Sequence, residues 1–156
     1  MVQLALHLPP GPELDLARGL CAYGVRLSPG LRGDNDPPFE DTYADYKVYL
    51  DVLAGADVEA GLAHFRAKTE RFAAEGYQFP AEVLVNLLLR VDRLPEALEA
   101  ARQYLGGADD RQLSCPGVTE LARRARDYAA LAEAAKGKGD PVNYLAGLIA
   151  GRGEPS

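Results

Sequence analysis

Hydroxyl and imidazole side chains are scarce in this 156-residue chain. It holds three serines, three threonines and two histidines, His7 and His64. Nucleophiles and general bases are usually drawn from these residue types, so the composition argues against an enzyme and gives no reason to expect a cofactor. Tryptophan is absent and isoleucine occurs once. Because β-sheet proteins favour β-branched and aromatic residues, the sequence also excludes an all-β fold.

Positive charge is in short supply as well. The formal net charge is −6 and the sequence pI is near 4.9, which predicts binding neither to nucleic acid nor to anionic membrane surfaces. The only two cysteines, Cys21 and Cys115, are expected to be reduced. The apolar opening at residues 1–8 lacks the basic flank of a signal peptide and ends at a Pro-Pro pair. We therefore expect a cytoplasmic protein.

What the chain does contain is alanine and leucine in a helical period, which predicts an all-α fold. The expected organisation is an extended segment at residues 1–11, a single all-helical domain at 12–150 and a disordered tail at 151–156. Proline, glycine and aspartate separate the expected helices. These helices are predicted over residues 12–27, 40–55, 57–76, 80–91, 95–105, 116–135 and 141–150.

The first and last of these helices carry marked apolar faces. In the first helix the face consists of Leu16, Leu20, Tyr23 and Leu27, and in the last helix Leu145, Leu148 and Ile149 are expected to form the buried side. A terminal hairpin without a polar cap exposes apolar surface, so the terminal helices, above all the last one, could also join copies of the chain into a homo-oligomer.

The middle of the chain contains two similar hairpin patterns. A helix ending in Leu-Leu-Leu-Arg at residues 87–90 leads through the turn at 91–94 into Pro-Glu-Ala-Leu-Glu-Ala-Ala at 95–101. The pairs Gly61-Leu62 and Ala97-Leu98 lie 36 residues apart, close to the repeat length of about 34 in tetratricopeptide repeats. The segment 81–105 therefore resembles the tetratricopeptide-repeat family, with weaker similarity at 43–72 and in the C-terminal hairpin.

This resemblance implies a right-handed stack of about three antiparallel helical hairpins, preceded by one further helix. It also implies a concave groove that binds an extended peptide or a partner helix. In that groove Asn86 would hydrogen-bond a ligand backbone or carboxylate, because an amide is both donor and acceptor. The implied partner-binding residues are Glu82, Asn86, Leu89 and Arg90 in one hairpin, and Tyr43, Tyr46 and Leu50 in the preceding one.

Two alternatives remain open at the level of sequence. The tyrosine face could be the core-facing side of its helix, and Asn86 could be an ordinary solvated amide. The preferred function is a non-enzymatic adaptor that binds a protein or peptide without metal or cofactor. The alternative function is a small-molecule- or metal-binding protein, or an enzyme, with an acidic pocket assembled from several of Asp34, Asp36, Asp41, Asp45 and Glu82.

Overall fold

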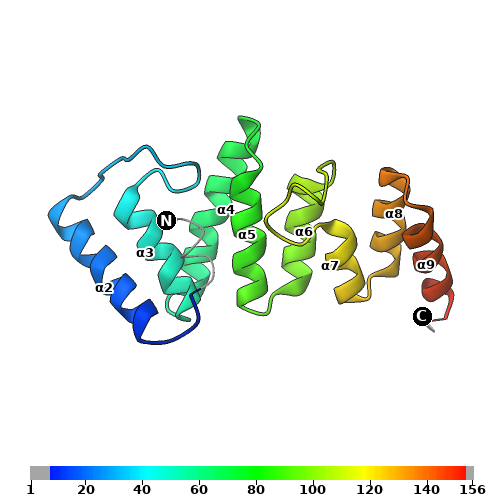
Figure 1. Ribbon diagram of the computed structural model, residues 1–156, viewed down its shortest axis with the longest axis horizontal. Coiled ribbons are helices and arrows are strands. Elements are labelled where there is room, and N and C mark those ends of the chain that lie inside the picture. The colour runs from blue at the N-terminus through cyan, green and yellow to red at the C-terminus, as the bar shows by residue number, and fades with distance from the viewer. Residues whose placement is uncertain (1–7, 154–156) are drawn as a thin grey trace. The chain divides into compact units, whose positions relative to one another are not determined.

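The computed structural model describes residues 8–153, and this part of the chain is all-helical, as the sequence predicts. No strand occurs among the described residues, in which a single isolated bridge pairs Arg32 with Asp41. Residues 1–7 of the expected extended segment and 154–156 of the expected tail lie outside them. The helices (Figure 1) are α2 Pro12–Leu27, α3 Thr42–Leu53, α4 Val58–Ala74, α5 Phe79–Arg90, α6 Leu94–Leu105, α7 Val118–Ala125, α8 Tyr128–Lys138 and α9 Pro141–Arg152.

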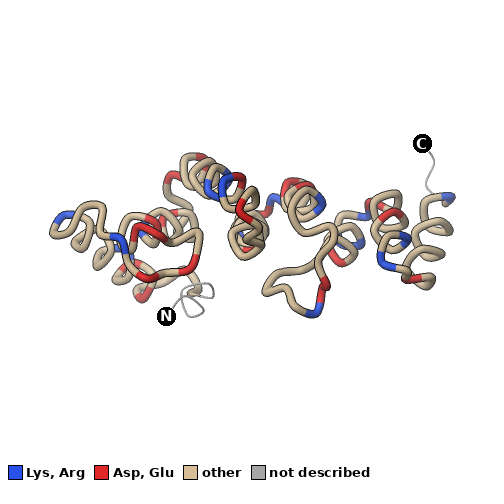
Figure 2. The backbone as a smooth tube through the Cα atoms, turned by 90° about the horizontal axis from the view of Figure 1, so that it is seen from above, with Lys and Arg blue, Asp and Glu red and all other residues tan. Residues whose placement is uncertain are grey.

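The chain divides into two compact units between Pro80 and Ala81, near the start of α5. The N-terminal unit contains α2, α3 and α4, and the C-terminal unit contains most of α5 together with α6 to α9. Acidic and basic residues are interspersed along the backbone of both units (Figure 2). Within the described part of the chain, no helix is long and apolar enough to cross a membrane.

Local signals account for the ends of the helices in the N-terminal unit. Pro12 occupies the first turn of α2, where its missing N–H would have no helical partner. Asp41 precedes α3, and its side chain accepts a hydrogen bond from the Ala44 amide at 3.3 Å. Asp57 stands before α4 as expected, but its φ of 48° is left-handed rather than the extended conformation of a capping residue.

Aromatic rings form the core of the N-terminal unit. Phe39, at the end of the loop before α3, stacks on Tyr46 with ring centroids 4.6 Å apart. The same ring meets Tyr49 of α3 and Phe65 of α4 edge-on, at 5.7 Å from each. Phe39, Tyr49 and Phe65 are almost completely buried. The loop is therefore fastened to both helices by an aromatic cluster.

Small residues let the helices of the C-terminal unit approach closely. The α5–α6 turn passes through Asp92 in the left-handed conformation. In this unit α8 packs against both α7 and α9. A Cβ atom at Gly147 of α9 would lie 2.9 Å from the Ala132 amide nitrogen and from the Tyr128 carbonyl oxygen of α8. Only glycine fits at this crossing, because the obstructing atoms belong to the backbone.

The single long helix expected over residues 116–135 is wrong. The structure contains two helices, α7 and α8, because Arg126 adopts a left-handed conformation with φ of 56°. Asp127 then caps α8 by accepting a hydrogen bond from the Ala130 amide at 2.9 Å. The apolar period continues across the break, so periodicity alone could not locate it. The local signal of a new helix is Asp127, because aspartate is one of the residues that commonly cap a helix start.

The apolar faces of the first and last helices in the described part of the chain are exposed to solvent. In α9, Leu145, Leu148 and Ile149 were expected on the buried side, but they are exposed, and the buried residue of this helix is Gly147, which lies against α8. In α2 the buried apolar side chain is Leu14. The last helix extends to Arg152, so residues 151 and 152 are helical rather than part of the expected tail.

Candidate functional site

The three predicted binding residues on α3 pack within the N-terminal unit. Tyr43 lies over Gly24 of α2, where an added Cβ would be 2.4 Å from the ring. Tyr46 stacks on Phe39, and burial raises the pKa of its hydroxyl. Leu50 is only 3% exposed and belongs to the core. These contacts are those of a core-facing side, and they leave no exposed apolar surface at Leu50 for a partner.

The other four predicted residues lie on α5 in two different environments. Glu82 is buried, whereas Arg90 is exposed and Leu89 is half-buried. The Ser114 amide nitrogen donates a hydrogen bond to the Glu82 carboxylate at 2.7 Å, and the Ser114 hydroxyl donates a second one. The Asn86 amide nitrogen donates to the Ser114 carbonyl oxygen at 3.3 Å. Glu82 thus binds the backbone amide of Ser114, and Asn86 binds the backbone carbonyl of the same residue.

The segment held by Glu82 and Asn86 is the chain's own α6–α7 loop. Next to Ser114, burial raises the pKa of the Cys115 thiol to about 12, so the thiol is protonated at neutral pH and is a poor nucleophile. Further along the chain, Lys138 of α8 pairs with Asp110 of the same loop. The amide chemistry expected of Asn86 therefore serves an internal segment, which is anchored to α5 at one point and to α8 at another.

The hydrogen bonds that join Glu82 and Asn86 to Ser114 lead to a prediction about the dynamics of the α6–α7 loop. Glu82→Gln removes a charged acceptor, and such hydrogen bonds contribute about 1.5 to 3 kcal/mol. We expect amide exchange at residues 110–117 to accelerate at least about tenfold, because the Ser114 amide opens more often. Hydrogen exchange read by mass spectrometry measures this. Asn86→Ala should have a smaller effect, and equal exchange rates in Glu82→Gln and wild type would contradict the prediction.

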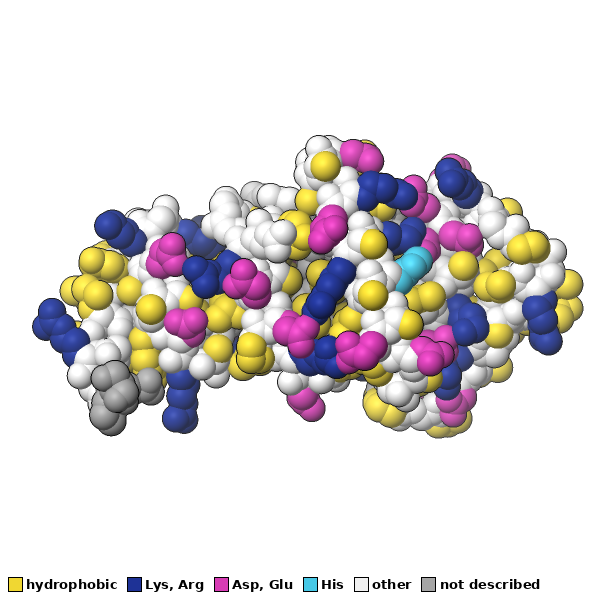
Figure 3. Space-filling model, turned by 180° about the vertical axis from the view of Figure 1, so that it is seen from behind, with side chains coloured by type: hydrophobic (Ala, Val, Ile, Leu, Met, Phe, Trp, Pro, Cys, Tyr) yellow, Lys and Arg dark blue, Asp and Glu magenta, His cyan; other side chains and the backbone are white. Residues whose placement is uncertain are grey.

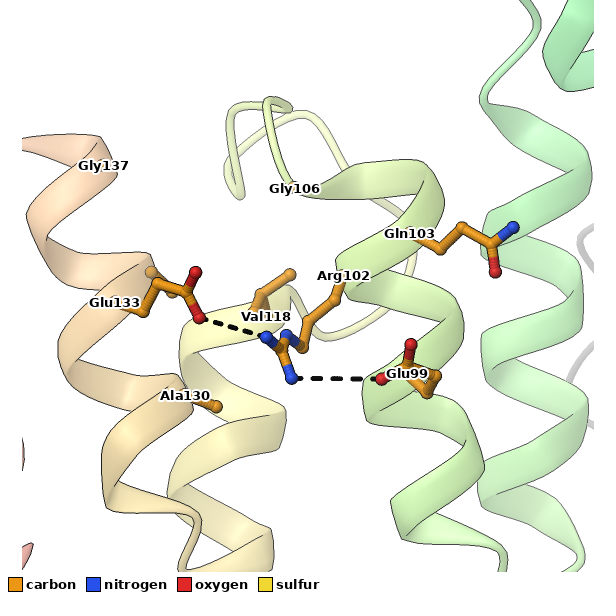
Figure 4. Close-up of a pocket in the computed structure, with 9 residues that line it drawn as sticks. Glu99, Arg102, Gln103, Gly106, Val118, Ala130, Glu133 and Gly137 are labelled. Carbon is orange, nitrogen blue, oxygen red and sulfur yellow. Dashed lines mark hydrogen bonds and ion pairs between the residues drawn. The ribbon is translucent and has the colours of Figure 1, made fainter.

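A hollow of about 490 Å³ opens between α6, α7 and α8, entirely within the C-terminal unit. Its rim carries Arg102 of α6 between two carboxylates (Figure 4). The Arg102 guanidinium lies 3.0 Å from Glu133 of α8 and 3.9 Å from Glu99 of α6. The rest of the lining is mostly small or short, consisting of Gln103, Gly106, Val118, Ala130, Ala134 and Gly137.

The rim charges of the hollow are accessible to a ligand. The Glu99 and Glu133 side chains are 72% and 74% exposed, and Arg102 is partly exposed. An exposed ion pair contributes about 0 to 1 kcal/mol to stability, so replacing one of these ion pairs with an ion pair to a ligand costs little free energy. One part of this arrangement has a signal in the sequence, since Glu99 and Arg102 lie one helical turn apart. Their pairing with Glu133, about thirty residues further on, had no local signal.

A second cluster of charges lies in the N-terminal unit around buried Asp45. Its carboxylate lies 2.7 Å from the His64 ring nitrogen Nε2 and 2.9 Å from the Lys68 ammonium, and it accepts a hydrogen bond from the Asp41 amide at 2.7 Å. Burial acts to raise the pKa of Asp45, but these hydrogen bonds outweigh it and hold the pKa below its ordinary value. Lys68 also pairs with Glu40, so the cluster ties the loop before α3 to α4.

The acidic residues proposed for an alternative pocket have different surroundings. Asp34 and Asp36 are exposed in the loop before α3. Asp41 caps α3, Asp45 is paired with His64 and Lys68, and Glu82 accepts from Ser114. Within residues 8–153, no group of three or more histidine, cysteine or carboxylate side chains could hold a metal ion.

The surface drawn in Figure 3 carries acidic and basic side chains in close alternation, with apolar side chains between them. Comparison of the chain with protein-family models, with curated proteins and with solved structures finds no match.

Proposed function

We propose that the chain is a non-enzymatic interaction module of helical hairpins similar to tetratricopeptide repeats, which binds a peptide or helix of a partner protein. The observation that carries the proposal is the hollow between α6, α7 and α8, with its small-residue lining and charged rim. Short side chains along the lining leave room for side chains of a ligand, and the exposed rim provides groups that orient it.

The hairpin packing of the C-terminal unit supports this proposal. Ala97 and Ala101 of α6, Ala122 of α7 and Ala135 of α8 are completely buried. Buried alanines bring neighbouring helices close together, as expected for hairpins of the tetratricopeptide-like kind. The hollow lies between α6, α7 and α8, and not along α3 and α5, where the resemblance implied the partner-binding residues.

The charge of the rim favours a partner segment with a basic side chain. Two carboxylates, Glu99 and Glu133, share one guanidinium, that of Arg102. A lysine or arginine of the bound protein would pair with Glu99 or Glu133, because these two carboxylates share Arg102. The overall charge of −6 acts in the same direction at long range.

Filling the hollow tests the proposal. Ala134→Phe places a large ring in the lining, whereas Ala129→Phe introduces the same ring on the exposed side of α8 outside the hollow. We expect a protein captured from cell lysate by the wild type to be retained by Ala129→Phe and lost by Ala134→Phe, as read by mass spectrometry. Circular dichroism must show equal helicity for all three proteins, and added salt should weaken the retained complex.

Two results would contradict the proposal. One is a partner that binds Ala134→Phe as well as it binds the wild type, which would place the interaction elsewhere. The other is a chain that captures no protein but binds a small molecule or a metal ion in purified form, measured by calorimetry. That outcome would favour the alternative function.

A further inference from the structure

Helix α2 presents an apolar face to solvent. Leu16, Leu20, Tyr23 and Leu27 are between 54% and 65% exposed. They follow one another at spacings of four, three and four residues, which places them in a single stripe along the helix. The opposite side of α2 packs against α3. Four large apolar side chains in one stripe form the kind of patch that marks an interaction surface.

A glycine interrupts the side chains beside this stripe. Gly19 lies in the interior of α2, and no atom of residues 8–153 lies within 4 Å of the position that its Cβ would occupy. Glycine in a helix interior costs about 1 kcal/mol relative to alanine. No neighbour in the described part of the chain requires the missing side chain, and its absence lets a second helix approach closely at this point.

The spacing of the stripe is the same when read from either end. Two α2 helices packed antiparallel would therefore place Leu16 of one copy against Leu27 of the other, and Leu20 against Tyr23. Each contact would occur twice about a two-fold axis, which is the commonest symmetry of protein oligomers. The stripe is thus complementary to itself in an antiparallel pair.

Charges at the two ends of α2 favour the same orientation. Asp15 and Arg26 are eleven residues apart, about three helical turns, so they lie on the same edge of the stripe. Both are exposed. In an antiparallel pair the same edge of both helices lies on one side of the contact, so Asp15 of one copy lies close to Arg26 of the other at both ends.

We propose that α2 is a self-association surface at which a second copy of this chain docks antiparallel. The exposed face of α9, with Val142, Leu145 and Ile149, is also apolar but lacks a pair of opposite charges along one edge. For this reason the inference assigns the contact to α2 rather than to α9, which the sequence had favoured. It does not depend on the hollow in the C-terminal unit.

Sedimentation velocity over about a hundredfold range of protein concentration tests the inference. We expect the wild type to shift from monomer to dimer as concentration rises. Leu20→Asp should raise the dimer dissociation constant at least about tenfold, because it buries a carboxylate in the stripe. Leu145→Asp is the matched control on α9 and should dimerise like the wild type. Both positions are exposed, so neither substitution disturbs the core.

Exchanging the charges tests the orientation. Asp15→Arg and Arg26→Asp should each weaken the dimer, because each juxtaposes like charges twice. The double variant Asp15→Arg/Arg26→Asp should restore dimerisation, since opposite charges again face each other. A wild type that stays monomeric throughout, loss of the dimer in Leu145→Asp rather than Leu20→Asp, or a double variant as weak as the single ones would overturn the inference. The same proteins can be assayed for partner capture, so failure here is distinguishable from failure of the proposed function.

Discussion

Phe65→Ala is expected to lower the free energy of unfolding by about 3 to 5 kcal/mol. Phe65 is completely buried and meets Phe39 at 5.7 Å and Tyr49 at 6.0 Å between ring centroids. Alanine would remove these contacts and leave a cavity at the point where the loop before α3 meets α3 and α4. Because these elements are fastened to one another through the ring, their packing can compensate only in part.

Urea unfolding followed by circular dichroism at 222 nm measures the loss. Phe65→Leu is the matched control, since it keeps an apolar side chain at the position and should lose less stability than Phe65→Ala. A loss below about 1 kcal/mol in Phe65→Ala would mean that the site collapses around the smaller side chain, contrary to the packing described for the aromatic cluster.

Asp45→Ala is expected to have the second-largest effect, a loss of about 2 to 4 kcal/mol. The substitution leaves the Asp41 amide and Lys68 without their buried acceptor, although Lys68 keeps Glu40 as a partner. Asp45→Asn should lose less, because the amide oxygen can still accept a hydrogen bond. Asp34→Ala, in the exposed part of the loop before α3, should change stability by no more than about 0.5 kcal/mol. The same urea titration compares the variants.

The pKa of Asp45 predicts how this contribution depends on pH. The pKa in the folded protein lies below the ordinary value of 3.8, so the folded state binds fewer protons than the unfolded state in this range. The stabilisation is fully present above the unfolded pKa and is lost as pH falls through the folded one. Wild type should therefore lose stability below about pH 4 more steeply than Asp45→Asn. Parallel acid profiles for the two proteins would contradict this assignment, since Glu40 and Asp51, whose pKa values are also lowered, remain in both.

Local signals predicted most helices closely. The helix expected from Pro12 to about Leu27 is confirmed as α2, because Pro12 suits a helix start and Ser28 with Pro29 ends it. The break between α7 and α8 was missed. The apolar period runs through Arg126 and Asp127 without glycine or proline, and the left-handed residue there is one that seldom adopts this conformation.

The candidate site was much less accessible to prediction. The resemblance implied that Asn86 hydrogen-bonds the backbone of a ligand and that Glu82 lies beside it, but nothing pointed to the chain's own loop at Ser114 as the backbone that both residues bind. Likewise, the four-residue spacing of His64 and Lys68 places them on one face of α4, but nothing local identifies Asp45 as their shared partner. In each case the contact joins residues that are distant in sequence.

By itself, the sequence determined the helical class, the positions of most helices and the existence of an apolar face on α2. Caps, turn residues and hydrophobic period act within a few residues, so they can be recognised without knowing the rest of the chain. Only the tertiary structure decided which faces are covered. The stripe of α2 stays exposed while Leu14 is buried, and Gly147 rather than Leu145 meets α8. Burial depends on what distant segments bring into contact, and the period of one helix carries no information about its neighbours.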